Sequence, residues 1–178
     1  MYQTTARPLL PVTLMGIPSG AAGTVATLKI MKRLARDGSR SPRIRAKVAE
    51  LFDGLRQKDY LSEMEALHSF VRDTIRYQRD PDGTELVQTP DATLQLGVGD
   101  CDDKSTLVGA MLKHAGFPSR FIAIGSRPGS YSHVYVEALM GGGINSGRRP
   151  LWIPVETTEP WPLGRGPSRY VSRMVVNI

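Results

Sequence analysis

The stretch Gly99–Ser105, with the sequence GDCDDKS, holds the single cysteine of the 178-residue chain and is the part best suited to covalent chemistry. Apolar residues follow Lys104 at helical spacing until Gly116, which predicts that Cys101 lies at the start of a helix. The unpaired N–H groups and the positive dipole at a helix start favour a thiolate. A lone cysteine can also be a small buried hydrophobe. The aspartates on both sides of Cys101 argue against a core position, so we take it as a candidate nucleophile.

A cysteine nucleophile needs a nearby base, and the chain has three histidines. His114 lies 13 residues further along the same predicted helix, about 20 Å away, and is expected only as a favourable charge at the helix end. His68 lies within a predicted helix, as a surface or structural histidine. His133 begins a predicted strand whose alternation places it on the accessible face, opposite the core-facing Val134. His133 is therefore the predicted base for Cys101, and the pair is expected to lower the pKa of the thiol.

The base in turn needs a carboxylate that orients its ring. Glu137 shares the face of His133 but is about 13 Å along the same strand, which is too far. Glu156 ends the predicted strand 151–155, and antiparallel pairing would bring it beside the start of the His133 strand. Glu156 is therefore the predicted partner of His133, with Glu159 as the fallback.

Hydrophobic periodicity and turn residues outline the elements that must position these side chains. Helices are predicted over 24–36, from Ser41-Pro42 onward, and from a capping-box pattern at Ser62 onward, and a short element is predicted from Pro90. Strands are predicted over 120–125, 132–139 and 151–155, and 170–178 could form another. Turns are predicted at 80–83 and 141–147.

The length fits one domain with extensions. We divide the chain into an extended arm at 1–23, a helical segment at 24–60, a core at 61–164 and a C-terminal tail at 165–178. No apolar run reaches 18 residues, which predicts no membrane partner. The first 22 residues lack the charged start of a secretory signal, so export by a signal peptide is not expected.

The net charge of +6 raises the possibility of nucleic-acid binding. The basic residues are spread along the chain without a nucleic-acid motif, so a solvated basic face or an acidic protein partner is favoured over nucleic acid. One cysteine among aspartates matches no standard zinc spacing, and helix capping explains the aspartates. The sequence therefore predicts neither a metal nor a cofactor.

Three segments, in order and spacing, resemble the motifs of the transglutaminase-like cysteine-protease superfamily, in its small bacterial and bacteriophage forms. They are GDCDDKS at 99–105, SHVYVE at 132–137 and WIPVETT at 152–158, and the resemblance covers about 62–164. It implies an α+β fold in which helices pack on a small antiparallel sheet, with the nucleophile at a helix start. It also implies a triad of Cys101, His133 and Glu156. The family usually has Asp at the third position, where this chain has the longer Glu.

The resemblance implies amide acyl transfer, with the backbone N–H of Cys101 and the side chain of Gln95 as tentative oxyanion donors. Hydrolysis of a protein or peptide substrate is favoured, and crosslinking by a lysine amine is an alternative. A second alternative is a structural role in a phage particle, with 1–23 and 165–178 contacting neighbouring subunits. The expected location is the bacterial cytoplasm or a virion.

Overall fold

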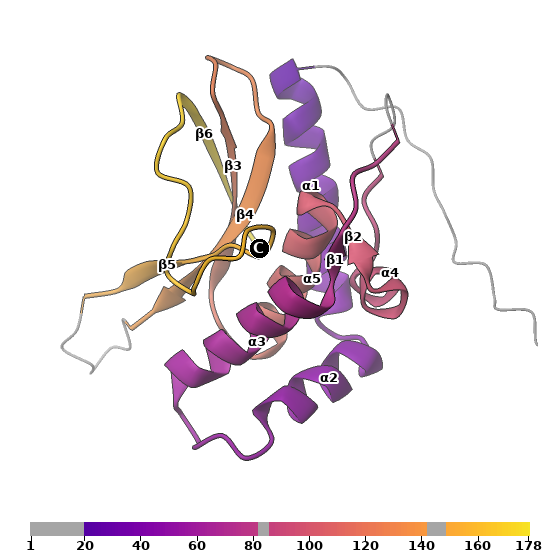
Figure 1. Cartoon of the computed structure of the whole chain (residues 1–178), viewed down its shortest axis with the longest axis vertical. Helices are drawn as coiled ribbons and strands as arrows, with labels where there is room; N and C mark the ends of the chain where they lie inside the picture. The colour runs from indigo at the N-terminus through magenta and orange to yellow at the C-terminus, as the bar shows by residue number, and fades with distance from the viewer. Residues whose placement is uncertain (1–19, 82–85, 142–148) are drawn as a thin grey trace, which may run out of the picture.

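The computed structural model describes residues 20–81, 86–141 and 149–178. It confirms the α+β class (Figure 1). The elements in chain order are α1 Gly20–Gly38, α2 Pro42–Phe52, α3 Tyr60–Thr74, β1 Arg76–Tyr77, α4 Pro90–Leu96, β2 Val98–Gly99, α5 Cys101–His114, β3 Ser119–Gly125, β4 His133–Met140, β5 Leu151–Val155 and β6 Ser172–Asn177.

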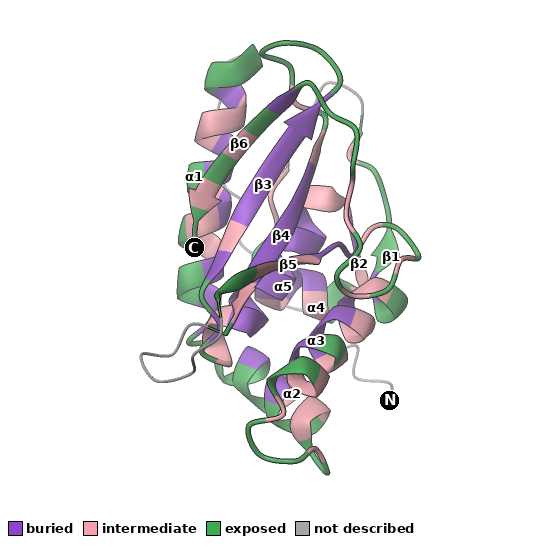
Figure 2. Cartoon of the chain, turned by 90° about the vertical axis from the view of Figure 1, so that its left-hand side faces the viewer, coloured by how far each residue is buried: buried purple, intermediate pink, exposed green. Residues whose placement is uncertain are grey.

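Four strands form an antiparallel sheet in the order β5-β4-β3-β6. The central strands β3 and β4 are buried along most of their length, whereas the edge strands mix exposed and partly buried residues (Figure 2). Alternation on β4 sends Val134 and Val136 into the main core and Tyr135 to the opposite face, as predicted. That opposite face is not open, because Tyr135 and Glu137 are both buried.

Helix α5 is the central element of the fold, lying between the sheet and the other helices (Figure 1). Its residues from Asp103 to Leu112 are all buried, which explains why its apolar residues surround the helix rather than forming one stripe. In its second turn the Ser105 hydroxyl donates a 3.1 Å hydrogen bond to the Val134 carbonyl of β4. The start of α5 is thereby fixed against the start of β4.

The helix starts follow local capping chemistry. Ser41 caps α2 through a bond from the Arg43 N–H, as the Ser-Pro pair predicted. The start predicted for α3 was wrong: Asp59 is the N-cap and accepts from the Ser62 N–H, so Ser62 lies inside the helix. An aspartate at N-cap serves the same purpose as a serine, because its side-chain oxygen also accepts a backbone N–H.

The two predicted extensions need correction. Helix α1 begins at Gly20, so residues 20–23 are helical, and the rest of the predicted arm, 1–19, lies outside the described residues. The predicted tail contains β6, which confirms the strand expected within 170–178 and pairs with β3 along six residues, so this segment is part of the sheet. Most of the glycine-rich turn predicted at 141–147 and part of that at 80–83 also lie outside the described residues. Among the described helices, none combines the length and apolar character needed to cross a membrane.

Candidate active site

The segment before Cys101 is held by a short parallel pairing that sequence reasoning did not anticipate. β1 pairs with β2, placing Tyr77 opposite Gly99, and the Gln78 N–H donates to the Gly99 carbonyl at 3.0 Å. A Cβ on Gly99 would lie 2.6 Å from the Cβ of Asp103, so only glycine fits there without a shift. The backbone entering the nucleophile helix is therefore closely constrained.

The aspartates around Cys101 build the helix start. The Asp100 carboxylate accepts from the backbone N–H groups of Asp102 and Asp103, at 2.9 and 3.1 Å, and Asp103 accepts in return from the Asp100 N–H. Asp103 is buried and also accepts from the backbone and side chain of Gln88, at 2.7 and 2.8 Å. Burial raises the pKa of Asp103 to about 7. These contacts are the capping role predicted for the aspartates.

The electrostatics of the Cys101 thiol differ from the sequence expectation. The thiol donates to Asp102 Oδ1 at 3.5 Å. Burial, followed by the negative charges of Asp102 and Asp100, raises the pKa of Cys101, and a hydrogen bond from the Val134 backbone only partly opposes this. The expected net lowering was therefore wrong, because desolvation and two carboxylates outweigh the helix start. The raised pKa favours the protonated thiol of Cys101 at neutral pH.

His133 is bound to Glu156. Its Nε2 donates to Glu156 Oε2 at 2.6 Å, and 24% of the His133 side chain is exposed against 1% of Glu156. Because Nε2 is used in this way, Nδ1 is the ring nitrogen left to accept a proton. The Cys101 thiol contacts the backbone of Val134, the residue after His133. An approach of the Cys101 sulfur to within about 3.5–5 Å of the ring stays a prediction.

Glu156 is held in its ionised form. Burial alone would raise its pKa, but hydrogen bonds from His133 and Thr158 and the charge of His133 outweigh burial and lower it. Its Oε1 accepts from the backbone N–H and the hydroxyl of Thr158, at 2.7 and 2.6 Å. A buried carboxylate bonded at both oxygens can fix the orientation of the imidazole.

Glu137, the carboxylate on the same strand as His133, contacts other side chains. Glu137 pairs with Arg120 at 2.6 Å and with Arg173 at 3.2 Å, and accepts from the Tyr135 hydroxyl at 3.3 Å. His114 Nδ1 bonds the Ser39 carbonyl at the far end of α5. Neither residue therefore belongs to the His133 site.

The role of Gln95 as an oxyanion donor stays a prediction. Gln95 is exposed on α4, and its amide oxygen accepts from the Arg43 guanidinium at 2.6 Å. The segment 97–100 turns between α4 and α5, so counting residues upstream of Cys101 does not give the direction of a side chain on α4.

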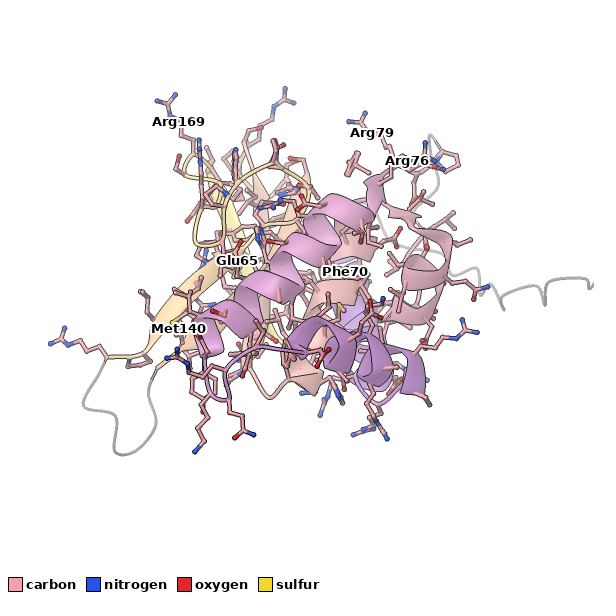
Figure 3. All side chains as sticks on the ribbon, turned by 60° about the horizontal axis from the view of Figure 1, so that its bottom comes forward. Glu65, Phe70, Arg76, Arg79, Met140 and Arg169 are labelled. Atoms are coloured by element: carbon pink, nitrogen blue, oxygen red, sulfur yellow. The ribbon has the colours of Figure 1, made fainter. Side chains whose placement is uncertain are left out.

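Tyr77 is the residue near the site that sequence reasoning missed. It lies next to Gly99 in the parallel pair, and burial raises the pKa of its hydroxyl, which therefore stays a donor. Arg76, the residue before Tyr77, and Arg79 lie at the same end of the molecule (Figure 3). The sequence signal was faint, because β1 and β2 have two residues each and no periodicity.

Asp100, Cys101 and Asp102 have ligand atoms within 4.8 Å of one another, the one such cluster among the described residues. Carboxylates suit calcium or magnesium, whereas a thiolate suits softer metals. Because the thiol is protonated and Asp100 caps α5, this donor set matches neither preference well.

Comparison with known proteins places the site in context. The family model of the transglutaminase-like superfamily matches residues 46–157, which is more than half of the chain and includes Cys101, His133 and Glu156. No curated protein matches the chain.

Two solved structures share the fold. A Parabacteroides distasonis protein provisionally described as a protease aligns with a TM-score of 0.53 and 18% identity, over 68% of this chain and 25% of that one. Calcium-bound LapG from Legionella pneumophila aligns with a TM-score of 0.51 and 19% identity, over 77% of this chain and 76% of that one. The chain thus spans about a quarter of the Parabacteroides protein.

Proposed function

Because the chain belongs to the transglutaminase-like superfamily, we propose that it catalyses cysteine-dependent acyl transfer at an amide, with hydrolysis of a protein or peptide as the reaction. The observation that carries the proposal is the 2.6 Å bond between His133 Nε2 and the buried Glu156 carboxylate. A buried acid on one ring nitrogen leaves the other as a base, and this imidazole lies beside the strand residue that contacts Cys101.

The proposed reaction has two halves. His133 Nδ1 takes the Cys101 thiol proton as the sulfur attacks the substrate carbonyl, and the protonated ring then gives this proton to the departing amine. The C–N bond breaks and a thioester remains on Cys101. A water that loses a proton to His133 next attacks the thioester, and the acid leaves as the sulfur is reprotonated. Glu156 orients the ring and balances its positive charge in both halves.

The oxyanion needs donors that are already in place. The backbone N–H of Cys101 at the start of α5 is one, because the first N–H groups of a helix have no carbonyl partner within the helix. The Tyr77 hydroxyl is the second in this proposal, replacing Gln95, because Tyr77 sits beside the segment that leads into Cys101.

The test is hydrolysis of fluorescein-labelled casein, followed by mass spectrometry of the new termini. Cys101→Ala should abolish cleavage, and Glu156→Gln should lower the rate about 10²–10⁴-fold, since a mispositioned base loses most of its effect. His114→Gln and Glu159→Gln are the matched controls, because they remove a histidine and a carboxylate outside the proposed triad. Both controls should keep the wild-type rate.

Crosslinking is separated from hydrolysis by adding dansylcadaverine to the same reaction. Incorporation of the amine into casein without new termini would replace hydrolysis by transamidation. Because the LapG structure is described as calcium-bound and the Asp100 cluster lies at the site, each assay is run with calcium and with EGTA. No Cys101-dependent product in either medium would reject the proposal.

A further inference from the structure

His68 on α3 is a fully buried histidine that the proposed chemistry does not use. Its Nε2 lies 2.7 Å from the backbone carbonyl oxygen of Glu156. A carbonyl oxygen can only accept, so Nε2 carries the proton and His68 donates. The other nitrogen, Nδ1, has no hydrogen-bond partner among the described residues, and the nearest carboxylate, Glu65 Oε1, is 3.9 Å away. A buried nitrogen without a hydrogen-bond partner destabilises the folded state. The bond from Nε2 to the Glu156 carbonyl must offset this loss of free energy.

Glu156 needs such an anchor because of where it lies. β5 ends at Val155, so the backbone of Glu156 is beyond the last registered pair of the sheet, Val136 with Val155. Its carboxylate is fixed by His133 and Thr158, but both bonds depend on where the backbone sits. His68 is the contact that ties this backbone to the helical side of the molecule.

Helix α3 is also tied to the nucleophile helix. The buried Lys104, three residues after Cys101, donates from Nζ to the carbonyls of Ile75 at 2.7 Å and Arg72 at 3.3 Å, at the end of α3. α3 thus holds α5 through Lys104 and the Glu156 backbone through His68. Further along α3 the Arg72 guanidinium donates to the Trp161 carbonyl at 2.9 Å, so the segment after Glu156 is held as well. Glu65 lies on α3 (Figure 3), where it lines a pocket together with Leu163.

We propose that His68 is a positioning residue, which sets the distance between the Glu156–His133 pair and the Cys101 helix by holding the Glu156 backbone against α3. The inference rests on the proposed function, since position matters to rate only if this pair serves as the base. Removing the His68 donor frees the Glu156 backbone to shift, and a shift near 1 Å costs about 10²-fold in rate when reacting groups must be aligned. The cost falls on kcat, because substrate binding does not involve His68.

Three variants test the proposal. His68→Met fills the space but removes the donor, whereas His68→Gln places an amide N–H near the position of Nε2. Val71→Ala is the matched control, because it opens a cavity in the same helix at a buried side chain with no role in the Glu156 contact. We expect His68→Met to lower kcat about 10–100-fold with KM unchanged, His68→Gln to restore kcat to within about threefold, and Val71→Ala to lower only the melting temperature.

A second measurement does not depend on turnover. In the wild type the proton between His133 Nε2 and Glu156 should give a downfield NMR signal, which shifts or broadens in His68→Met and returns in His68→Gln. If the signal responds in this way but the wild type cleaves nothing, the positioning role stands and the proposed function fails. If the wild type is active and His68→Met matches Val71→Ala in both kcat and the signal, His68 is only a core residue and the inference is overturned.

Discussion

The protonated state of Cys101 can be tested by removing the carboxylate closest to it. Asp102 Oδ1 accepts from the Cys101 sulfur at 3.5 Å, and its charge is a main cause, after burial, of the raised thiol pKa. Asp102→Asn keeps the shape of the side chain and removes the charge. The pKa of Cys101 should fall, and the thiol should alkylate faster at any pH below that pKa.

The size of the effect follows from the distance. Two unit charges 3.5 Å apart interact by about 1.2 kcal/mol in water and about 4.7 kcal/mol at an effective permittivity near 20. These energies correspond to a lowering of the pKa by about 0.9 to 3.5 units. A thiolate of lower pKa is also less nucleophilic, with a Brønsted coefficient of about 0.5, which halves the gain on a logarithmic scale. The net acceleration should lie between about threefold and about fiftyfold.

The assay is the rate of iodoacetamide labelling from pH 6 to 9, followed by intact-protein mass spectrometry. Cys101 is the single cysteine of the chain, so every added group reports on this thiol. Asp37→Asn is the control, because Asp37 is far from the thiol. It is on the last turn of α1, near Ser39. Ser39 contacts His114 at the far end of α5, about 20 Å from Cys101. Asp37→Asn should label at the wild-type rate.

The wild-type rate should climb through pH 8.5, the midpoint of an unperturbed thiol, without a plateau. A plateau already reached near pH 6 would mean that a thiolate–imidazolium pair forms in the resting protein. An unchanged or slower rate in Asp102→Asn would show that the carboxylate does not hold the proton on the sulfur. Either result refutes the electrostatic reasoning.

Three further outcomes are expected. Tyr77→Phe should lower kcat about 10²-fold with little change in KM in the casein assay, because it removes the hydroxyl that we propose as an oxyanion donor. Gly99→Ala should lower the free energy of unfolding in urea by about 1–3 kcal/mol, because the new Cβ displaces Asp103 from the helix cap. Burial lowers the pKa of His68 in the folded protein. As the pH falls through about 6.5, His68 therefore takes up a proton in the unfolded chain before it does so in the folded one. The free energy of unfolding should then decline more steeply in the wild type than in His68→Gln, by up to about 1.4 kcal/mol per pH unit.

Those parts of the fold that follow from local patterns could be predicted from the sequence. The Ser41-Pro42 start of α2 and the run of α5 depend on neighbouring residues along one helix. The contact of Glu156 with His133 could also be predicted. Antiparallel pairing of β4 with β5 places Glu156 near His133. A rise of 3.3 Å per residue puts Glu137 too far along the same strand.

The features that were missed depend on contacts between distant segments. Nothing near residues 172–177 shows that this strand will pair with β3 rather than remain a tail. Tyr77 and Gly99 meet in a parallel pair of two-residue strands, which is too short to leave a pattern. His68 looked like an ordinary helical histidine because its partner, the Glu156 carbonyl, is 88 residues away.

The pKa of Cys101 was predicted in the wrong direction because the sequence shows the helix start but not how far the sulfur is buried. A helix start favours a thiolate by a fraction of a charge spread over several N–H groups, and here two of those groups already bind Asp100. The full charges of Asp102 and Asp100 then act on a partly buried sulfur. The resting enzyme in our proposal is therefore a neutral thiol beside an imidazole, and the proton must move to His133 Nδ1 as the substrate carbonyl is attacked. A buried, ionised Glu156 suits that mechanism, because it stabilises the imidazolium at the moment when it forms.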